Sequence, residues 1–146
     1  MRAAEGAALA ADLFGRVAAL EAKRREIAAL APQVPLRYQE ALKRRVAELG
    51  APLVDGDAAL AREVALCADR CDVSEELTRL DAHLRHFLAL LDAPEPVGRQ
   101  LDFLCQELHR EVNTCGSKAG DAAIARIVIE MKAGIEAIRE QVQNLE

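Results

Sequence analysis

Two glutamates spaced one helical turn apart, Glu107 and Glu111, are the residues of this sequence best suited to do chemistry. Carboxylates at that spacing project side by side and repel each other unless a positive charge lies between them. Arg110 could supply that charge. So could a divalent cation, because carboxylates suit magnesium or manganese and an imidazole, here His83, favours manganese. Spacing alone does not separate such a site from an ordinary pair of surface glutamates.

A metal ion held by these groups would polarise a phosphoryl oxygen or lower the pKa of a bound water, which is how many nucleases cleave phosphodiesters. Glu76 lies two helical turns before His83 on one side of its own expected helix, and extends the candidate site. Nearby cations would contact phosphates, since arginine offers a two-pronged donor. The candidates are Arg79, Arg99, Arg110 and Lys118.

A helix beginning at Gly98 is expected to position the central part of this site. Its apolar residues recur every three or four positions, a pattern typical of a helix with one apolar stripe. The other positions mix both charge signs, amides and an imidazole, whereas a solvated face more often repeats Glu, Lys and Ala. Glycines predict that the helix ends or bends near residues 116–120. The apolar stripe consists of Leu101, Leu104, Leu108 and Val112.

Apolar periodicity predicts helices through the rest of the chain, so the expected fold is all-α: an elongated helical bundle forming one domain, residues 1–146. Pro32 and Pro35 predict the end of the first helix, and glycine, proline and aspartate clusters predict the later breaks. Asp72 is placed to cap a helix in a box with Glu75. The expected helices cover residues 3–30, 36–49, 58–70, 73–91, 98–116 and 121–144.

The first helix is long and its apolar stripe is narrow, which is common in antiparallel hairpins and coiled coils. Residues 1–50 are therefore expected to form a helical hairpin or a projecting arm, and residues 57–146 to carry the polar motif. The four cysteines fall at apolar helix positions without a C-x-x-C pair, which predicts buried, reduced thiols.

Composition excludes some functions. The net charge of −5 argues against a broad electrostatic surface for nucleic acid, although a local basic cluster can still engage phosphates. No apolar run is long enough to cross a bilayer, and the N-terminus lacks a secretory signal pattern. A cytoplasmic protein without membrane contact is expected.

The run from Gly98 to Lys118 resembles the signature of the YicC/YloC family of bacterial metal-dependent endoribonucleases, approximately G-R-x-L-D-F-x-x-Q-E-x-N-R-E-x-N-T-x-x-S-K. His109 departs from it, because asparagine is usual there. Residues 72–84 resemble the family segment D-V-x-E-E-L-x-R-L-x-x-H, and residues 138–146 resemble its terminus I-R-E-Q-V-Q-N-I-E. The signature positions that match are Gly98, Arg99, Leu101, Asp102, Phe103, Gln106, Glu107, Arg110, Glu111, Asn113, Thr114, Ser117 and Lys118.

This resemblance implies the C-terminal half of an endoribonuclease that cuts single-stranded or loop RNA with manganese or magnesium. It also implies a homo-oligomer, with a hexamer suggested, and an N-terminal family region that is not in this sequence. On the matching positions, metal ligation or acid–base work is expected of His83, Glu107 and Glu111, with Glu76 behind them. RNA phosphates are expected to contact Arg79, Arg99, Arg110 and Lys118, while Gln106, Asn113 and Thr114 orient carboxylates or read the sugar.

Two alternatives remain open at this level. The motif could be a buried polar lock between helices, with Glu76 paired to Arg79 and Glu111 paired to Arg110 or Lys118. The chain could also be a helical assembly module without catalysis of its own. The metal-site hypothesis requires His83, Glu107 and Glu111 to meet in space, because a separation beyond about 8 Å excludes a shared ion.

Overall fold

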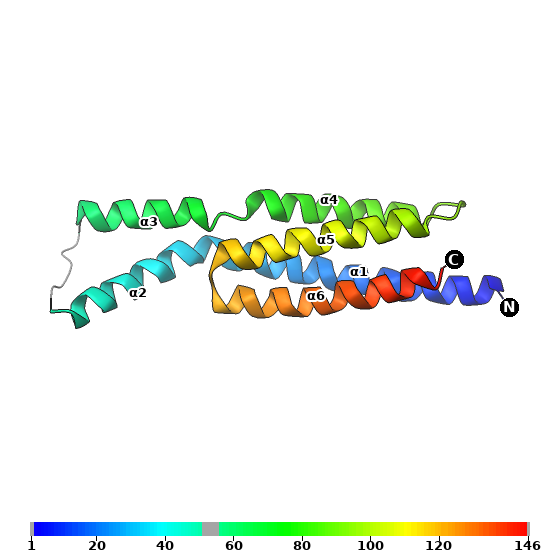
Figure 1. Ribbon diagram of the computed structural model, residues 1–146, viewed down its shortest axis with the longest axis horizontal. Helices are drawn as coiled ribbons and strands as arrows, with labels where there is room; N and C mark the ends of the chain where they lie inside the picture. The colour runs from blue at the N-terminus through cyan, green and yellow to red at the C-terminus, as the bar shows by residue number, and fades with distance from the viewer. Residues whose placement is uncertain (1, 51–55, 146) are drawn as a thin grey trace.

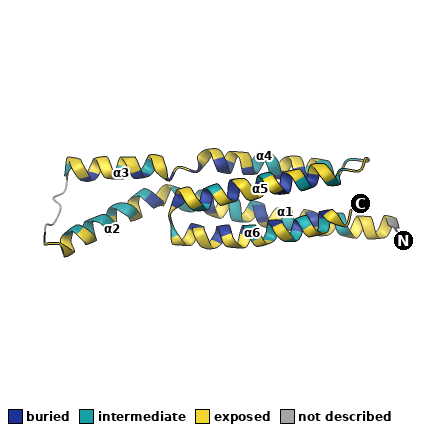
Figure 2. Ribbon diagram, in the orientation of Figure 1, coloured by how far each residue is buried: buried dark blue, intermediate teal, exposed yellow. Residues whose placement is uncertain are grey.

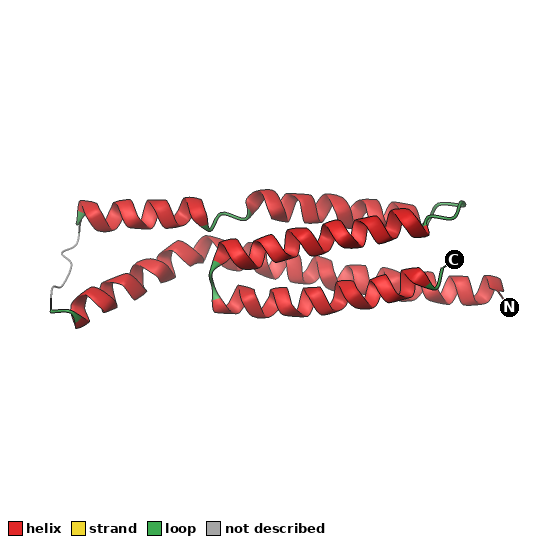
Figure 3. Cartoon of the chain, viewed as in Figure 1, coloured by secondary structure: helices red, strands yellow, loops and turns green. Residues whose placement is uncertain are grey.

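The computed structural model describes residues 2–50 and 56–145 and contains only helices and connecting segments within them, which confirms the all-α prediction (Figures 1 and 3). None of the helices in these ranges has the length and apolarity needed to cross a membrane. The elements are α1 (Arg2–Leu30), a 3-10 turn η1 (Ala31–Gln33), α2 (Val34–Glu48), α3 (Ala58–Arg70), α4 (Ser74–Leu91), α5 (Gly98–Ala119) and α6 (Ala122–Gln143).

Four helices, α1, α4, α5 and α6, lie side by side as an elongated antiparallel bundle (Figure 1). Helix α5 packs against both α4 and α6, and α1 closes the other side by packing on α4 and α6. The predicted apolar stripe of α5 faces this core, since Leu101, Leu104, Leu108 and Val112 are all buried. Helices α2 and α3 extend beyond the bundle and carry far fewer buried residues, as Figure 2 shows.

Residues 1–50 were expected to form a hairpin or a projecting arm, and the described part of this range, residues 2–50, forms the arm. Helix α2 continues beyond the end of α1 instead of folding back on it, and α2 forms a projecting hairpin with α3. The reason is local. Pro32 and Pro35 sit in the first turns of η1 and α2, where proline has no intrahelical hydrogen bond to lose, so a short 3-10 turn joins the helices without reversing them.

Helices α3 and α4 are separate elements joined by a short break. The N-cap of α4 is Val73, one residue later than expected, and Asp72 accepts a hydrogen bond from the backbone N–H of Ser74 at 2.9 Å from just outside the helix. Glu75 does not complete a capping box, because its carboxylate lies 3.5 Å from the guanidinium of Arg79 instead. Val73, between them, is buried and anchors the break to the core.

The turn between α5 and α6 brings these helices into close contact. Helix α5 continues through Gly116 without a bend and ends at Ala119, after which Gly120 adopts a left-handed conformation with φ of 58°. Asp121 then caps α6 by accepting from the N–H of Ile124 at 3.1 Å. A Cβ added at Gly116 would lie 3.1 Å from Cγ1 of Val128, so the absence of a side chain permits this approach.

All four cysteines are buried, free thiols, as predicted. Burial raises the pKa of the Cys105 thiol to about 12, and burial together with the charges of Glu76 and Glu111 does the same for Cys115. Both thiols therefore stay protonated at neutral pH and behave as small apolar groups of the core.

A bulky side chain at Gly116 should separate α5 from α6. We expect Gly116→Leu to lower the free energy of unfolding by about 1–3 kcal/mol, because the close contact with Val128 leaves no room for it. Gly15→Leu on the exposed face of α1 is the matched control, since nothing lies within 4 Å of a Cβ built there. Urea denaturation of both variants measures the difference, and equal stabilities would contradict the proposed close packing.

Candidate metal and ribonuclease site

Three side chains that the sequence singled out meet between α4 and α5. One ligand atom from each of His83, Glu107 and Glu111 lies within 4.8 Å of the other two, well inside the 8 Å limit set above. Glu107 and Glu111 are neighbours because they are one turn apart on α5, whereas His83 reaches them because α4 packs antiparallel on α5. The described part of the chain has no other such group, and neither Glu76 nor the exposed His109 belongs to this one.

The donor set fits a divalent ion. Two ligands of one ion lie at most about 4–5 Å apart when its bonds are about 2.0–2.6 Å, so only small side-chain adjustments separate this arrangement from coordination. Two carboxylates and one imidazole suit manganese better than magnesium. Glu111 is buried, while His83 and Glu107 are partly exposed, so the group can be reached from solvent on one side.

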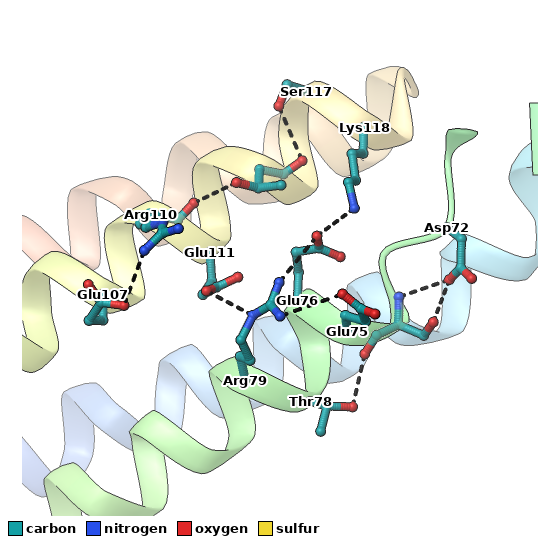
Figure 4. Close-up of polar contacts among 12 residues, drawn as sticks. Asp72, Glu75, Glu76, Thr78, Arg79, Glu107, Arg110, Glu111, Ser117 and Lys118 are labelled. Carbon is teal, nitrogen blue, oxygen red and sulfur yellow. Dashed lines mark hydrogen bonds and ion pairs between the residues drawn. The ribbon is translucent and has the colours of Figure 1, made fainter. Parts of the chain in front are cut away.

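Arg79 holds the buried member of this cluster. Its Nε donates to Oε1 of Glu111 at 3.0 Å, and its other nitrogens lie 3.5 Å from Glu75 and 3.6 Å from Glu76 (Figure 4). The hydrogen bond and charge of Glu111 raise the pKa of the Arg79 guanidinium further. Arg79 is thus a cation already bound to a carboxylate that a metal ion would need.

Glu76 is paired with Lys118 and does not belong to the cluster of His83, Glu107 and Glu111. It is only 2% exposed, and Nζ of Lys118 donates to its Oε1 at 2.7 Å (Figure 4). Burial raises the pKa of Glu76, but the hydrogen bond from Lys118 and the charges of Lys118 and Arg79 outweigh burial and bring the pKa below its usual value. Its Oε2 is buried without a hydrogen-bond partner in the described chain.

Part of the expected polar lock is therefore present, with different partners. Glu76 does lie near Arg79, but its closer partner is Lys118, and Glu111 binds Arg79 instead of Arg110 or Lys118. These contacts join α4 to α5 beside the His83 cluster. Glu111 belongs both to this lock and to the cluster of His83, Glu107 and Glu111, so the two sets of contacts are connected through one side chain.

The remaining candidates differ in how far their polar groups are already used. Arg110 is exposed and lies 3.8 Å from Glu107, and Arg99 makes no ion pair with any residue in the described ranges. Gln106 donates to Asp102 at 3.1 Å. Asn113 accepts from Lys132 at 2.7 Å, and Thr114 donates to the carbonyl of Arg110 on its own helix at 3.0 Å. Arg99 and Arg110 are thus the cations most available to a ligand.

Sequence reasoning missed the contacts between α5 and α6. Lys132 of α6 donates to Asn113, and Arg139 of the same helix donates to Asp102 at 2.9 Å. Asp102 matches the family signature, which indicated that it has a role. The spacing of residues along the chain did not predict which residue it contacts.

Comparison with known proteins finds relatives of one family. Residues 27–146 match the family model described as "Endoribonuclease YicC-like, C-terminal". The chain is 39% identical over 147 residues to a protein of Clostridioides difficile named "Probable endoribonuclease YicC", covering all of this chain and 50% of that protein. A Haemophilus influenzae protein of the same name is 48% identical over 85 residues, 58% of this chain and 30% of its own length. The chain thus spans about half the length of the C. difficile relative.

Acid should weaken the contact between α4 and α5. Because the folded-state pKa of Glu76 lies below 4.5, the unfolded chain takes up this proton first as the pH falls. The contribution of Glu76 to stability is therefore complete above about pH 4.5 and is lost below it. We expect Glu76→Gln to lower the free energy of unfolding at neutral pH by about 1 kcal/mol and to flatten its dependence on pH in the acid range.

Urea denaturation at a series of pH values tests this expectation. Glu75→Gln is the control, since it removes the same charge from the adjacent side chain, which is 78% exposed. Parallel stability curves for the parent chain and Glu76→Gln across the acid range would show that Glu76 does not carry the effect.

Proposed function

This chain belongs to the YicC-like endoribonuclease family, and from that premise we propose that it cleaves RNA internally at the cluster of His83, Glu107 and Glu111. The supporting observation is the approach of the three ligand atoms to within 4.8 Å of one another. We propose a divalent ion, manganese or magnesium, as the cofactor. When bound, it would supply Lewis-acid polarisation of a phosphoryl oxygen or a bound water of lowered pKa.

The protein's own residues divide the remaining work. Glu111 is buried and fixed by Arg79, so it serves as a rigid anchor of the cluster. Glu107 and His83 are partly exposed, so both can reach the substrate, and the one that is not coordinated to the ion can exchange a proton with the attacking or leaving oxygen. Arg99 and Arg110 contact RNA phosphates. Lys118 is already paired with Glu76, so its role is to hold α5 against α4.

A second candidate function is assembly. The α2–α3 hairpin projects from the bundle and exposes large apolar side chains, with Leu36 60% and Leu66 47% exposed. Such a surface suits contact between copies of the chain, in line with the expected homo-oligomer. An intact oligomer without ribonuclease activity in the presence of manganese would favour assembly as the function of this chain.

Loss of any cluster residue should abolish cleavage without unfolding the chain. We expect Glu107→Gln, Glu111→Gln and His83→Asn each to reduce manganese-supported cleavage of single-stranded RNA by about a hundredfold or more. His86→Asn is the matched control, because His86 lies one turn further along α4 and is exposed. Cleavage by all three cluster variants at the parent rate, with native circular dichroism, would remove the proposed site.

Metal binding should respond to Arg79 separately from activity. Arg79 competes with a cation for Glu111, so we expect Arg79→Met to bind Mn²⁺ more tightly than the parent chain and Glu111→Gln to bind it more weakly. Isothermal titration with Mn²⁺ measures both. Arg85→Met on the same helix is the control, since Arg85 pairs with Asp81 outside the cluster. Unchanged or weaker Mn²⁺ binding by Arg79→Met would contradict this competition, and weaker binding would indicate that Arg79 positions Glu111 for the ion.

A further inference from the structure

An open cavity of about 350 Å³ lies between α5 and the end of α6, and its lining residues come from these two helices. Phe103 and Val142 form part of its apolar wall, and Arg99, Gln106 and Gln143 bring polar groups to it. Its size falls within the range of small-molecule sites, about 300–1,000 Å³. The cavity therefore combines an aromatic ring, a guanidinium and side-chain amides in one place.

Phe103 is unusual among the apolar residues of α5. It is 58% exposed, while the four residues of the apolar stripe are at most 2% exposed. The chain has only three phenylalanines, one tyrosine and no tryptophan. Few aromatic rings are therefore present to stack on a base, and Phe103 is an exposed one on the helix that carries the candidate site. A single exposed apolar side chain is common on protein surfaces and needs no explanation. The exposure of Phe103 is notable because its ring lines a cavity that also carries polar side chains.

We propose that Phe103 is a stacking platform for an unpaired RNA base in this cavity. Base–aromatic stacking accepts any base, and neighbouring amides add hydrogen bonds to base edges. Arg99 lies beside the ring without an ion pair in the described chain, so its guanidinium is available to the adjoining phosphate. The wall is fixed, because Asp102 is held by Arg139 at 2.9 Å and by Gln106 at 3.1 Å.

The position of Phe103 connects this cavity to the cluster. Arg99, Phe103, Glu107 and Arg110 follow one another at intervals of four, four and three residues, so they lie along one face of α5. The face runs for about 16 Å from Arg99 to Arg110. An RNA strand lying along it would place a base on Phe103 one helical turn from Glu107, with phosphates near the arginines at its two ends.

This inference rests on the proposed ribonuclease function and deepens it by assigning Phe103 to one base of an unpaired RNA strand. A duplex keeps its bases stacked on each other and offers none to Phe103. A second copy of the chain is the competing occupant of the cavity. The free guanidinium of Arg99 favours a nucleotide over an apolar surface, which would leave this charge unpaired.

Binding without cleavage tests the stacking directly. The probes are a labelled oligoadenylate of about ten nucleotides and an abasic ribose–phosphate oligomer of equal length, each titrated in EDTA and followed by fluorescence anisotropy. We expect Phe103→Ala to weaken oligoadenylate binding about tenfold and to leave the abasic oligomer unaffected, while Phe103→Trp retains both. Phe14→Ala, which removes a half-exposed ring from α1, should change neither.

The outcomes separate this inference from the proposed function. Equal binding of oligoadenylate by Phe103→Ala and the parent chain, or no measurable binding by the parent, would overturn the stacking site. Dissociation of an oligomer by Phe103→Ala in analytical ultracentrifugation would also overturn it, by assigning the cavity to contact between copies. Manganese-supported cleavage by Glu107→Gln at the parent rate would refute the catalytic cluster and leave the EDTA binding result standing.

Discussion

Two carboxylates, Glu76 and Glu111, are buried between α4 and α5, and each needs a positive partner there. An unpaired ionised group in the interior is strongly unfavourable, so Arg79 must reach Glu111 and Lys118 must reach Glu76. Both contacts cross from one helix to the other. Apolar packing brings α4 and α5 together, but a one-turn slip between them would keep much of the apolar contact and break both pairs. The ion pairs therefore specify the register of the two helices.

The candidate site depends on that register. Glu111 belongs both to the pair with Arg79 and to the cluster with His83 and Glu107, so the contact that aligns the helices also orients a carboxylate of the candidate site. The polar lock and the metal site were separate interpretations of the motif. In the structure the lock and the three candidate ligands share one side chain, and a divalent cation bound to Glu111 would have to compete with the guanidinium of Arg79.

Each side of helix α5 carries side chains with a different role. One side buries the apolar stripe, the side toward α4 carries the cluster, and the side toward α6 carries the contacts of Asp102 and Asn113 and the cavity beside Phe103. The exposed ridge between these sides presents Arg99 and Arg110. Gly116 permits the close approach of α6 that keeps this arrangement narrow. The α2–α3 hairpin lies apart from it and offers apolar surface instead of catalytic groups.

The sequence by itself determined whatever depends on neighbours within one helix. The apolar stripe of α5 and the side-by-side projection of Glu107 and Glu111 follow from spacings of a few residues, because helix geometry brings such positions together. The resemblance added which positions belong to the motif. It did not supply the partner of Glu111 or the use of Lys118 by Glu76. Those two outcomes were decided by tertiary structure, since they depend on how two helices distant in sequence are aligned, which local spacing does not encode.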